Sequence, residues 1–524
     1  MGSHYDVIIV GGGHNGLVSA TYLQKAGKRV LVLENQPIFG GAAVSAEAFP
    51  GVPARLSRYS YLVSLFPQEI MSELGLNVEL RRRRYSSYTP VPGSDTGLLI
   101  DVHDQQATKE SFARIGAAAD YEKWVEFYSM TEALAGAIFP QLREPLLTKE
   151  ELKTRVHAHT GSNDAWHHLI DTPIDQTISE WFSSDVVRGV VLTDGLIGTF
   201  PDGPGDDNVS RCFLYHVIGG GTGDWDVPVG GMGQVTSQLA KRAQEAGATL
   251  LANADVHSID PEGKVVWQLG DDTGHASADL IIAGCSPTEL GRLTGSGSSE
   301  PAAEGAQVKV NLVVSRLPQL TDRNVSVEGA FGGTFHINET WSQLQHAWSE
   351  AKNGRIPDPV PAEIYCHSLT DPTILDTSLQ DAGVHTLTIF ALHTPHRLIQ
   401  GQDPDRVRSD MQERVLRSLN SVLAEPIEDV ILRAPDGQLC VETKTTLDLE
   451  NTLRLPGGNI FHGPLSWPFA GEGDPLTTAA ERWGVATSHP RILLGGSGAK
   501  RGGGVSGLGG HNAAMAALDI LGVS

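Results

Sequence analysis

The sequence predicts an α/β protein, and two observations support that prediction. First, residues 5–10 and 29–33 are short apolar runs, typical of parallel strands buried on both faces, and a helical pattern separates them. Second, the glycines gather in clusters, most densely at 11–16, 219–233 and 495–510. Clustered glycines mark places where the backbone turns sharply or approaches another group closely.

The first glycine cluster has the spacing G-x-G-x-x-G. Gly11 permits a tight turn, Gly13 lets the backbone approach a pyrophosphate, and Gly16 lets a helix pack closely on a strand. His14 and Asn15 lie within this turn, and we assign them to the same site. The N-terminus of the following helix offers free N–H groups to phosphates. The motif therefore predicts a Rossmann-like dinucleotide-binding domain.

An acidic residue ends the second predicted strand. Glu34 is placed to accept hydrogen bonds from an adenosine ribose, and we assign its neighbour Asn35 to the same nucleotide. Gly40 and Gly41, followed by Ala42, form a second close approach of the backbone just beyond the acid. This second glycine pair favours FAD over NAD as the dinucleotide.

These residues resemble the FAD-dependent oxidoreductases of the amine-oxidase and phytoene-desaturase superfamily, whose fingerprint has the same acid, a short spacer and a glycine pair. Many members carry Arg after that pair, where this chain has Ala42, so phosphate neutralisation by an arginine is not assumed here. The C-terminal glycines resemble the phytoene-desaturase-like subgroup that includes pyridine-nucleotide-disulfide-oxidoreductase-domain proteins. Other matching stretches are 57–62, 225–233, 255–256 and 459–463.

The resemblance implies further cofactor contacts. It implies that Val256 contacts the adenine and that Ser497 lies near the ribityl and phosphate groups, and we assign Gly496 to the same cofactor site. It also implies that the backbone at Val505 and Ser506 faces the isoalloxazine ring. The helix that follows would point its N-terminus at the flavin, where a positive dipole end stabilises reduced flavin.

The same resemblance implies a discontinuous FAD-binding domain of the glutathione-reductase type. We expect it to comprise residues 1–104, 228–290 and 455–524. Residues 105–227 and 291–454 are then expected to form an α+β substrate domain, mainly helical in its first part.

Three residues are candidates for catalysis. Lys500 stands in a turn where the resemblance leads one to expect Thr-His-Pro, and a cation there would assist flavin reoxidation or hold an anionic substrate. Lys500 and Arg501 pointing outward is the alternative. His462 and His511 are candidate general bases, with structural hydrogen bonding to the backbone as the alternative.

Five residues are candidates for substrate contact. Arg58, Tyr59 and Tyr61 are expected over the flavin face, although packing against the FAD domain explains them nearly as well. Trp225 and Trp467 are expected to line a substrate cavity, with burial in the core as the alternative.

These features predict an FAD-dependent oxidase or dehydrogenase of the desaturase type. It would take a hydride from a C–H bond of a small organic substrate, and O₂ or another acceptor would reoxidise the flavin. No second G-x-G-x-x-G motif occurs at a strand–helix junction, which disfavours a pyridine-nucleotide reductase. The alternatives are an amine oxidase that forms an imine and an FAD-containing binding or assembly protein with little turnover.

Composition limits the partners and the compartment. The 524 residues include 39 Lys and Arg against 62 Asp and Glu, and the formal charge of −23 disfavours nucleic acid. No apolar run reaches about 18 residues, so no integral membrane segment is expected. The four cysteines are far apart, which favours a reducing, cytoplasmic location and no zinc site. We predict no metal, and the sequence leaves homodimer formation open.

Overall fold

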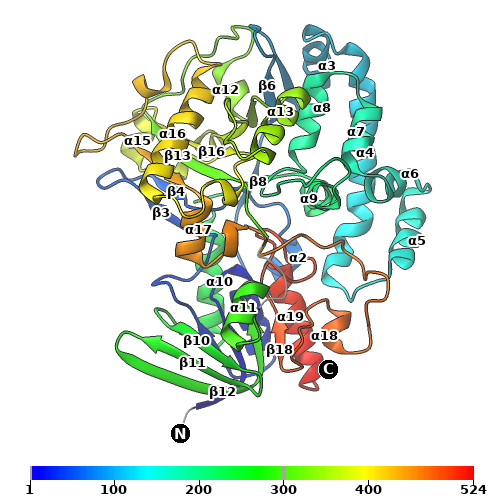
Figure 1. Ribbon diagram of the computed structural model, residues 1–524, viewed down its shortest axis with the longest axis vertical. Coiled ribbons are helices and arrows are strands. Elements are labelled where there is room, and N and C mark those ends of the chain that lie inside the picture. Colours follow the sequence, from blue (N-terminus) through cyan, green and yellow to red (C-terminus); the bar gives the residue numbers. More distant parts are fainter. Residues whose placement is uncertain (1–2, 298–302, 524) are drawn as a thin grey trace.

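The computed structural model describes residues 3–297 and 303–523, coloured along the chain in Figure 1. The described residues do not include 1–2, 298–302 and 524, which belong to the predicted domain segments.

The first sheet has seven strands, in the order β10-β11-β12-β1-β2-β9, with β18 also paired to β12. The C-terminal half of β12 runs parallel to β1 and β18, and the parallel part of the sheet continues through β2 to β9. The N-terminal half of β12 forms an antiparallel meander with β11 and β10. The meander extends away from the rest of the molecule at the bottom of Figure 1. The strands are β1 (Ser3–Val10), β2 (Val30–Leu33), β9 (Thr249–Leu251), β10 (Asp255–Asp260), β11 (Lys264–Leu269), β12 (Asp272–Ala283) and β18 (Ile492–Leu494).

Three helices cover this sheet: α1 (His14–Lys25), α10 (Gly233–Glu245) and α19 (Leu508–Ile520). Helix α1 packs against both of the others, and nine of its twelve residues are buried. Because helices pack on it from more than one side, the apolar residues Leu17, Val18, Ala20 and Leu23 do not lie on a single stripe of α1. The α/β class and the Rossmann-like unit predicted from the sequence are confirmed.

The second sheet also has seven strands, in the order β17-β13-β16-β15-β14-β6-β7. All neighbours are antiparallel except β14 and β6. The strands are β6 (Tyr85–Pro90), β7 (Gly97–Asp101), β13 (Val308–Val314), β14 (Thr334–Ile337), β15 (Ala362–Tyr365), β16 (His385–Ala391) and β17 (Val441–Lys444). There are also two small two-stranded sheets. One pairs β3 (Ser45–Glu47) with β4 (Arg55–Ser57), and the other pairs β5 (Leu80–Arg82) with β8 (Asp226–Pro228).

The second sheet includes residues that the sequence analysis assigned to the FAD-binding domain. Strands β6 and β7 fall inside the predicted segment 1–104, yet they hydrogen-bond in the second sheet. The segment boundary therefore needs correction, because the local strand pattern of residues 85–101 does not reveal which sheet the strands join.

Residues 105–225 form a helical layer, seen on the right of Figure 1. Its helices are α3 (Gln105–Arg114), α4 (Tyr121–Ile138), α5 (Lys149–Thr160), α6 (Asp164–Trp166), α7 (Ile174–Trp181), α8 (Asp185–Thr193) and α9 (Asp207–Val217). Trp166, Phe127, Phe182 and Phe213 are among the largest side chains buried in the core of this layer.

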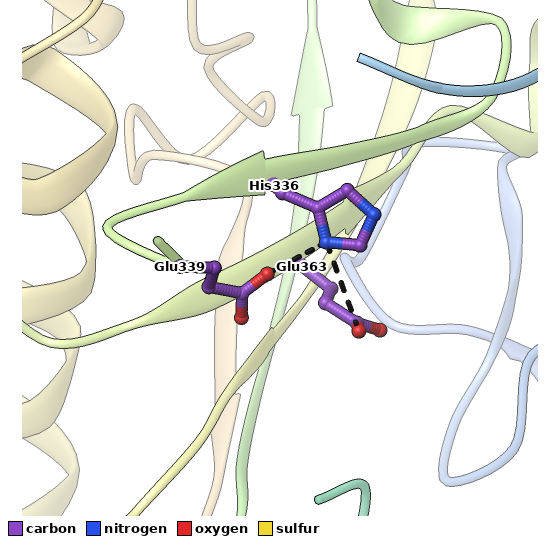
Figure 2. A group of neighbouring side chains, drawn as sticks. All are labelled: His336, Glu339 and Glu363. Atoms are coloured by element: carbon purple, nitrogen blue, oxygen red, sulfur yellow. Dashed lines mark hydrogen bonds and ion pairs between the residues drawn. The ribbon is translucent and has the colours of Figure 1, made fainter. Parts of the chain in front are cut away.

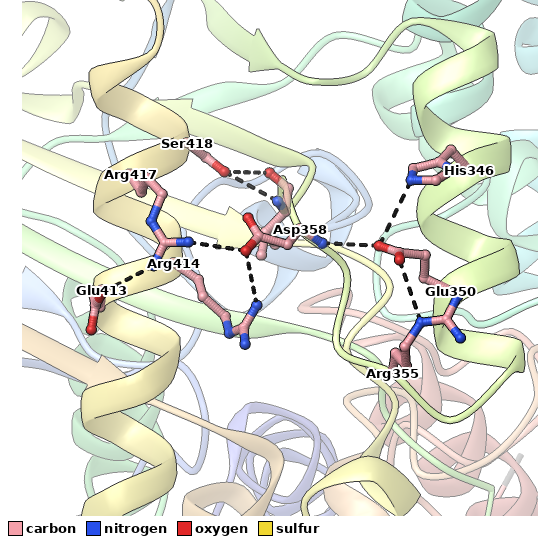
Figure 3. Close-up of polar contacts among 9 residues, drawn as sticks. His346, Glu350, Arg355, Asp358, Glu413, Arg414, Arg417 and Ser418 are labelled. Carbon is pink, nitrogen blue, oxygen red and sulfur yellow. Dashed lines mark hydrogen bonds and ion pairs between the residues drawn. The ribbon is translucent and has the colours of Figure 1, made fainter.

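Ion pairs hold the outer helices of the second sheet together. Arg417 and Arg414 of α16 (Pro404–Asn420) both reach the carboxylate of Asp358, whose backbone N–H donates to Glu350 of α13 (Trp341–Lys352) (Figure 3). The remaining helices are α2 (Gln68–Glu73), α11 (Pro287–Thr294), α12 (Val327–Phe331), α14 (His367–Thr370), α15 (Thr377–Asp381), α17 (Thr446–Leu453) and α18 (Ala479–Arg482). Within the described ranges, no helix combines the length and apolar character needed to cross a bilayer.

Candidate cofactor and substrate site

A large cavity lies at the carboxyl ends of the parallel strands of the first sheet. Its empty space, including the open mouth, is about 2100 Å³. Residues that directly end or follow β1, β2 and β12 line it, and so do residues of the second sheet and of the C-terminal glycine turn. Ligands of open parallel sheets bind at this edge. The lining residues predicted from sequence are Gly11, Gly13, His14, Asn15, Gly16, Glu34, Asn35, Gly41, Ala42, Arg58, Tyr59, Tyr61, Trp225, Val256, His462, Ser497 and Val505.

The two N-terminal glycine turns touch each other at the cavity. A Cβ atom on Gly16 would lie 2.1 Å from the carbonyl oxygen of Gly11, so no other residue fits there without a backbone shift. Gly40 has a φ of 134°, and its N–H donates to the carbonyl of Gly12 at 2.9 Å. Gly40 therefore braces the turn but does not itself line the cavity.

The Glu34 carboxylate is fixed at the end of β2. Its Oε2 accepts from the Gly12 N–H at 2.7 Å and its Oε1 from the Gln36 N–H at 2.8 Å. Burial raises the pKa of Glu34, and these two backbone donors oppose the rise. The carboxylate is thus rigid and faces the cavity beside Val256, an arrangement suited to receiving ribose hydroxyls.

The C-terminal glycine turn closes the cavity from the other side. Ser497 and Val505 line the cavity, together with Gly503 and Gly504, whereas Gly496 and Ser506 do not. Ser506 is fully buried, and its hydroxyl accepts from the backbone N–H at the start of α19 at 3.3 Å.

Gly496 packs against the strand end of the first sheet. A Cβ atom there would lie 2.5 Å from the carbonyl oxygen of Gly284, so the two backbones are in close contact. We infer that Gly496 and Ser506 shape the turn, while Ser497 and Val505 face the ligand.

Two neutral histidines face the cavity. Burial lowers the pKa of His14 to about 4, against the effect of the 3.1 Å hydrogen bond between its Nε2 and the carbonyl of Gly504. Burial is the main cause that lowers the pKa of His462 to about 4, and the nearby His14 lowers it further. The Nδ1 of His462 is buried and has no hydrogen-bond partner among the described residues.

An aromatic cluster forms the wall on the side of the second sheet. Tyr61 stacks on Trp225 with ring centroids 6.0 Å apart and contacts Tyr365 and Phe390 at 4.9 and 4.7 Å. Trp225 donates from its indole N–H to the carbonyl of His216 at 3.0 Å. Of the neighbouring candidates, Arg58 forms an ion pair with Glu442, and burial raises the pKa of Tyr59.

Besides Gly40, Gly496 and Ser506, three further predicted site residues lie away from the cavity lining. The ammonium of Lys500 pairs with the Asp474 carboxylate on the surface. His511 packs edge-on against Tyr22 at 5.2 Å and bonds to Asn512. Trp467 stacks on Phe469 with ring centroids 5.9 Å apart. Lys500 therefore points outward, as the alternative for it predicts, whereas His511 bonds to the side chain of Asn512 and not to the backbone. We propose no catalytic role for either residue.

Sequence reasoning missed Lys309, which lines the same cavity. Its side chain is 4% exposed, and Nζ donates to the carbonyls of Ser57 and Ser60, both at 2.7 Å. Burial is the main cause that lowers the pKa of Lys309 to about 7. The available signal was a lysine inside the largely apolar run of β13, which also contains Asn311.

The comparisons with known proteins agree with this geometry. A family model described as an NAD(P)-binding Rossmann-like domain matches residues 9–70. An uncharacterised protein of Mycobacterium tuberculosis is 50% identical, over 99% of this chain and 97% of that protein. Pyridine nucleotide-disulfide oxidoreductase domain-containing protein 2 of Rattus norvegicus is 29% identical, over 97% of this chain and 92% of its own length. A solved structure of a putrescine oxidase triple mutant aligns over 100% of both chains with a TM-score of 0.57 and 17% identity.

The chain is also similar to the phytoene dehydrogenase of Streptomyces griseus, at 22% identity over 74% of this chain, and to a probable flavin-containing monoamine oxidase A of Dictyostelium discoideum, at 24% over 57%. These similarities place it in the oxidoreductase superfamily of phytoene dehydrogenases and flavin-containing amine oxidases. Within this superfamily, the chain belongs to the family of the Mycobacterium tuberculosis protein.

Proposed function

We propose that this protein is an FAD-dependent oxidase or dehydrogenase that takes a hydride from a C–H bond of a small organic substrate. The product would contain a new C=C, C=N or C=O bond, and O₂ or another acceptor would reoxidise the flavin. The observation that carries this proposal is the shape of the large cavity: one continuous space joins a dinucleotide-binding edge to an apolar compartment.

The residues at the dinucleotide-binding edge fit FAD. The glycine turns and the N-terminus of α1 would hold the pyrophosphate, and Glu34 would hold the ribose. The backbone around Val505 would lie against the flavin ring. Bound FAD would supply the two-electron acceptor for hydride transfer.

The other end of the cavity suits an apolar part of a substrate. Side chains from the helical layer, the second sheet and the C-terminal region supply its walls and would exclude water from the reacting atoms. These residues are Leu62, Leu65, Ile197, Phe390, Leu392, Phe461 and Leu465.

Two residues are proposed to act on the reacting groups. Lys309 would act through its buried Nζ, either as an ammonium group or as a neutral amine that donates hydrogen bonds. It would stabilise negative charge that develops on the bound substrate or on FAD during the reaction. The neutral imidazole of His462 could accept a proton at its Nδ1 atom, which has no partner in the part of the chain described.

An amine is the second candidate for the group that is oxidised. The solved structures of the same fold favour it, since they include putrescine oxidase and the cyclohexylamine oxidase of Brevibacterium oxydans. The second structure aligns over 98% of both chains with a TM-score of 0.55 and 16% identity. Because proteins with one fold carry out many different reactions, the substrate screen includes alcohols and unsaturated compounds as well as amines.

Anaerobic half-reactions test the proposal. Purified protein loaded with FAD is mixed without oxygen with amines, alcohols and unsaturated terpenoids, and loss of the oxidised flavin spectrum is recorded. We expect one class to bleach the flavin and a second mixing with O₂ to distinguish oxidase from dehydrogenase behaviour.

The matched variants are Lys309→Met and Lys500→Met, since Lys309 lines the cavity and Lys500 does not. Only Lys309→Met should slow a half-reaction. Failure to bind FAD after incubation would overturn the proposal, and so would a bound flavin that no substrate class reduces.

A further inference from the structure

A second cavity, which we call the polar chamber, lies behind the aromatic wall of the large cavity. Its empty space is about 780 Å³. Tyr61, Leu62, Ile197, His216 and Trp225 line both spaces, so the wall between them is one side chain thick at these positions. The other lining residues used below are Arg83, Trp124, Tyr128, Asp194, His336 and Glu363.

Buried acids from three elements meet at this chamber. Figure 2 shows His336 between two carboxylates: its Nδ1 lies 2.7 Å from Glu339 Oε2 and 3.9 Å from Glu363 Oε1. Tyr365 donates its hydroxyl to Glu363 Oε2 at 2.5 Å. Glu339 is only 1% exposed, and its Oε1 has no hydrogen-bond partner among the described residues. One oxygen of Glu339 therefore lacks a donor beside the chamber, although Glu339 itself is not part of the lining.

The charges of the chamber do not balance. Among the described lining residues, the carboxylates of Asp194 and Glu363 face one guanidinium, that of Arg83, and burial lowers the pKa of His336 and favours its neutral form. Glu339 contacts His336 but is not part of the lining, and burial raises its pKa well above the usual range. Burial raises the pKa of both Asp194 and Glu363 to about 7, which is the response of carboxylates that lack a counter-charge. A proton or a bound cation would relieve this excess.

Two further features favour a cation. Asp194 caps the C-terminal end of α8, where the helix dipole is negative. Aromatic rings line the rest of the space, including the Trp124–Tyr128 pair with centroids 4.5 Å apart. Faces of such rings attract organic cations.

We propose that the polar chamber binds the ammonium group of an organic cation between the carboxylates of Asp194 and Glu363 and the surrounding aromatic rings. His336, Glu339 and Glu363 could together ligate a metal ion instead. The organic cation is favoured because Arg83 repels a divalent ion twice as strongly as a monovalent one, and because aromatic rings line much of the chamber.

The cation held in this way is an anchor rather than the group that meets the flavin. The Tyr61–Trp225 wall separates the chamber acids from the large cavity, so a ligand anchored there would direct its other end toward that wall. This inference goes beyond the proposed function, because binding can be measured without turnover and even without FAD.

Binding of 1-aminohexane, compared with 1-hexanol and hexanoate, tests the inference. The readouts are the thermal unfolding midpoint of the FAD-loaded protein and its tryptophan fluorescence, which reports on Trp124 and Trp225 in the chamber wall. We expect saturable binding of the ammonium compound and at least tenfold weaker binding of the other two. Glu363→Gln and Asp194→Asn should each weaken ammonium binding at least tenfold.

The matched control is Asp202→Asn, whose carboxylate is exposed and distant from the lining. It should bind 1-aminohexane as the unmodified protein does.

Two chamber variants are used so that a folding defect in one leaves the other informative. Equal affinity of both chamber variants and the control overturns the inference. So does binding of Zn²⁺ or Mn²⁺ that Glu363→Gln abolishes while 1-aminohexane does not bind. Loss of FAD binding would sink only the proposed function.

Discussion

The side-chain oxygen of Asn15 accepts a hydrogen bond from the backbone N–H of Gly510 at 3.2 Å, across 495 positions of sequence. The contact joins the first turn of α1 to the first turn of α19, and α1 packs closely along α19. Asn15 thus has a structural task besides its place in the cavity lining. The two helix N-termini that flank the nucleotide-binding edge are held as one unit.

Gly510→Ala should destabilise the protein. An added Cβ would lie 2.0 Å from the carbonyl oxygen of Asn15, so α1 and α19 must separate, at a cost of about 1–3 kcal/mol. Alanine has the better helix propensity, by ~1 kcal/mol, so any loss must come from the contact. Thermal unfolding measures the effect, with Gly203→Ala as the control because nothing lies near its added Cβ. Equal midpoints for the two variants would contradict this account of the helix contact.

Glu34→Gln should weaken FAD binding at least tenfold, or about 1.4 kcal/mol. The amide keeps only one acceptor oxygen, so it cannot accept from both the Gly12 and Gln36 N–H groups and still receive the ribose. Titration of flavin fluorescence on the apoprotein gives the affinity. Glu47→Gln, on an exposed position of β3, is the control and should bind FAD normally. Unchanged affinity of Glu34→Gln would remove Glu34 from the nucleotide site.

Lys309→Met should change the pH dependence of stability. The pKa of Lys309 is about 7 in the folded chain and its ordinary value is 10.5, so between these pH values the unfolded chain binds the extra proton. The free energy of unfolding of the unmodified protein should therefore rise, relative to that of Lys309→Met, as the pH goes from about 7 to about 10. Urea unfolding of both proteins at several pH values measures this difference. A difference that stays constant with pH would mean that Lys309 titrates normally.

The neighbours Lys500 and Arg501 should respond very differently to replacement by methionine. Arg501 is 2% exposed and donates to the backbone carbonyls of Gln141, Glu144 and Trp483. Arg501→Met leaves these carbonyls without their donor and should cost at least about 3 kcal/mol. Lys500→Met removes only a surface ion pair and should cost at most about 1 kcal/mol. Thermal unfolding of the two variants side by side checks the contrast, and similar losses would count against a buried anchoring role for Arg501.

The nucleotide-binding end of the site could be predicted because its signals are local. Gly11, Gly16 and Glu34 occupy fixed positions in a strand–turn–helix–strand unit, and each position follows from backbone sterics or ribose recognition. The C-terminal turn was reached by resemblance rather than by spacing. Even there, the sequence could not separate Ser497, which faces the cavity, from Gly496, which packs behind it.

The substrate end could not be predicted because it depends on tertiary packing. From its sequence, Lys309 is only one residue of a strand; the fold brings its side chain to the carbonyls of Ser57 and Ser60 at the cavity. Asp194, His336 and Glu363 come from three separate elements, and nothing in their local sequence links them. Lys500 illustrates the opposite error, since an unusual residue in a cofactor motif points to the surface.

The joining of α1 to α19 has a consequence for how the protein matures in a cell. Helix α1 is made well before α19, so the flank that α19 supplies is missing until the ribosome has passed residue 520. On the proposed function, the complete dinucleotide site would form only after that point in synthesis.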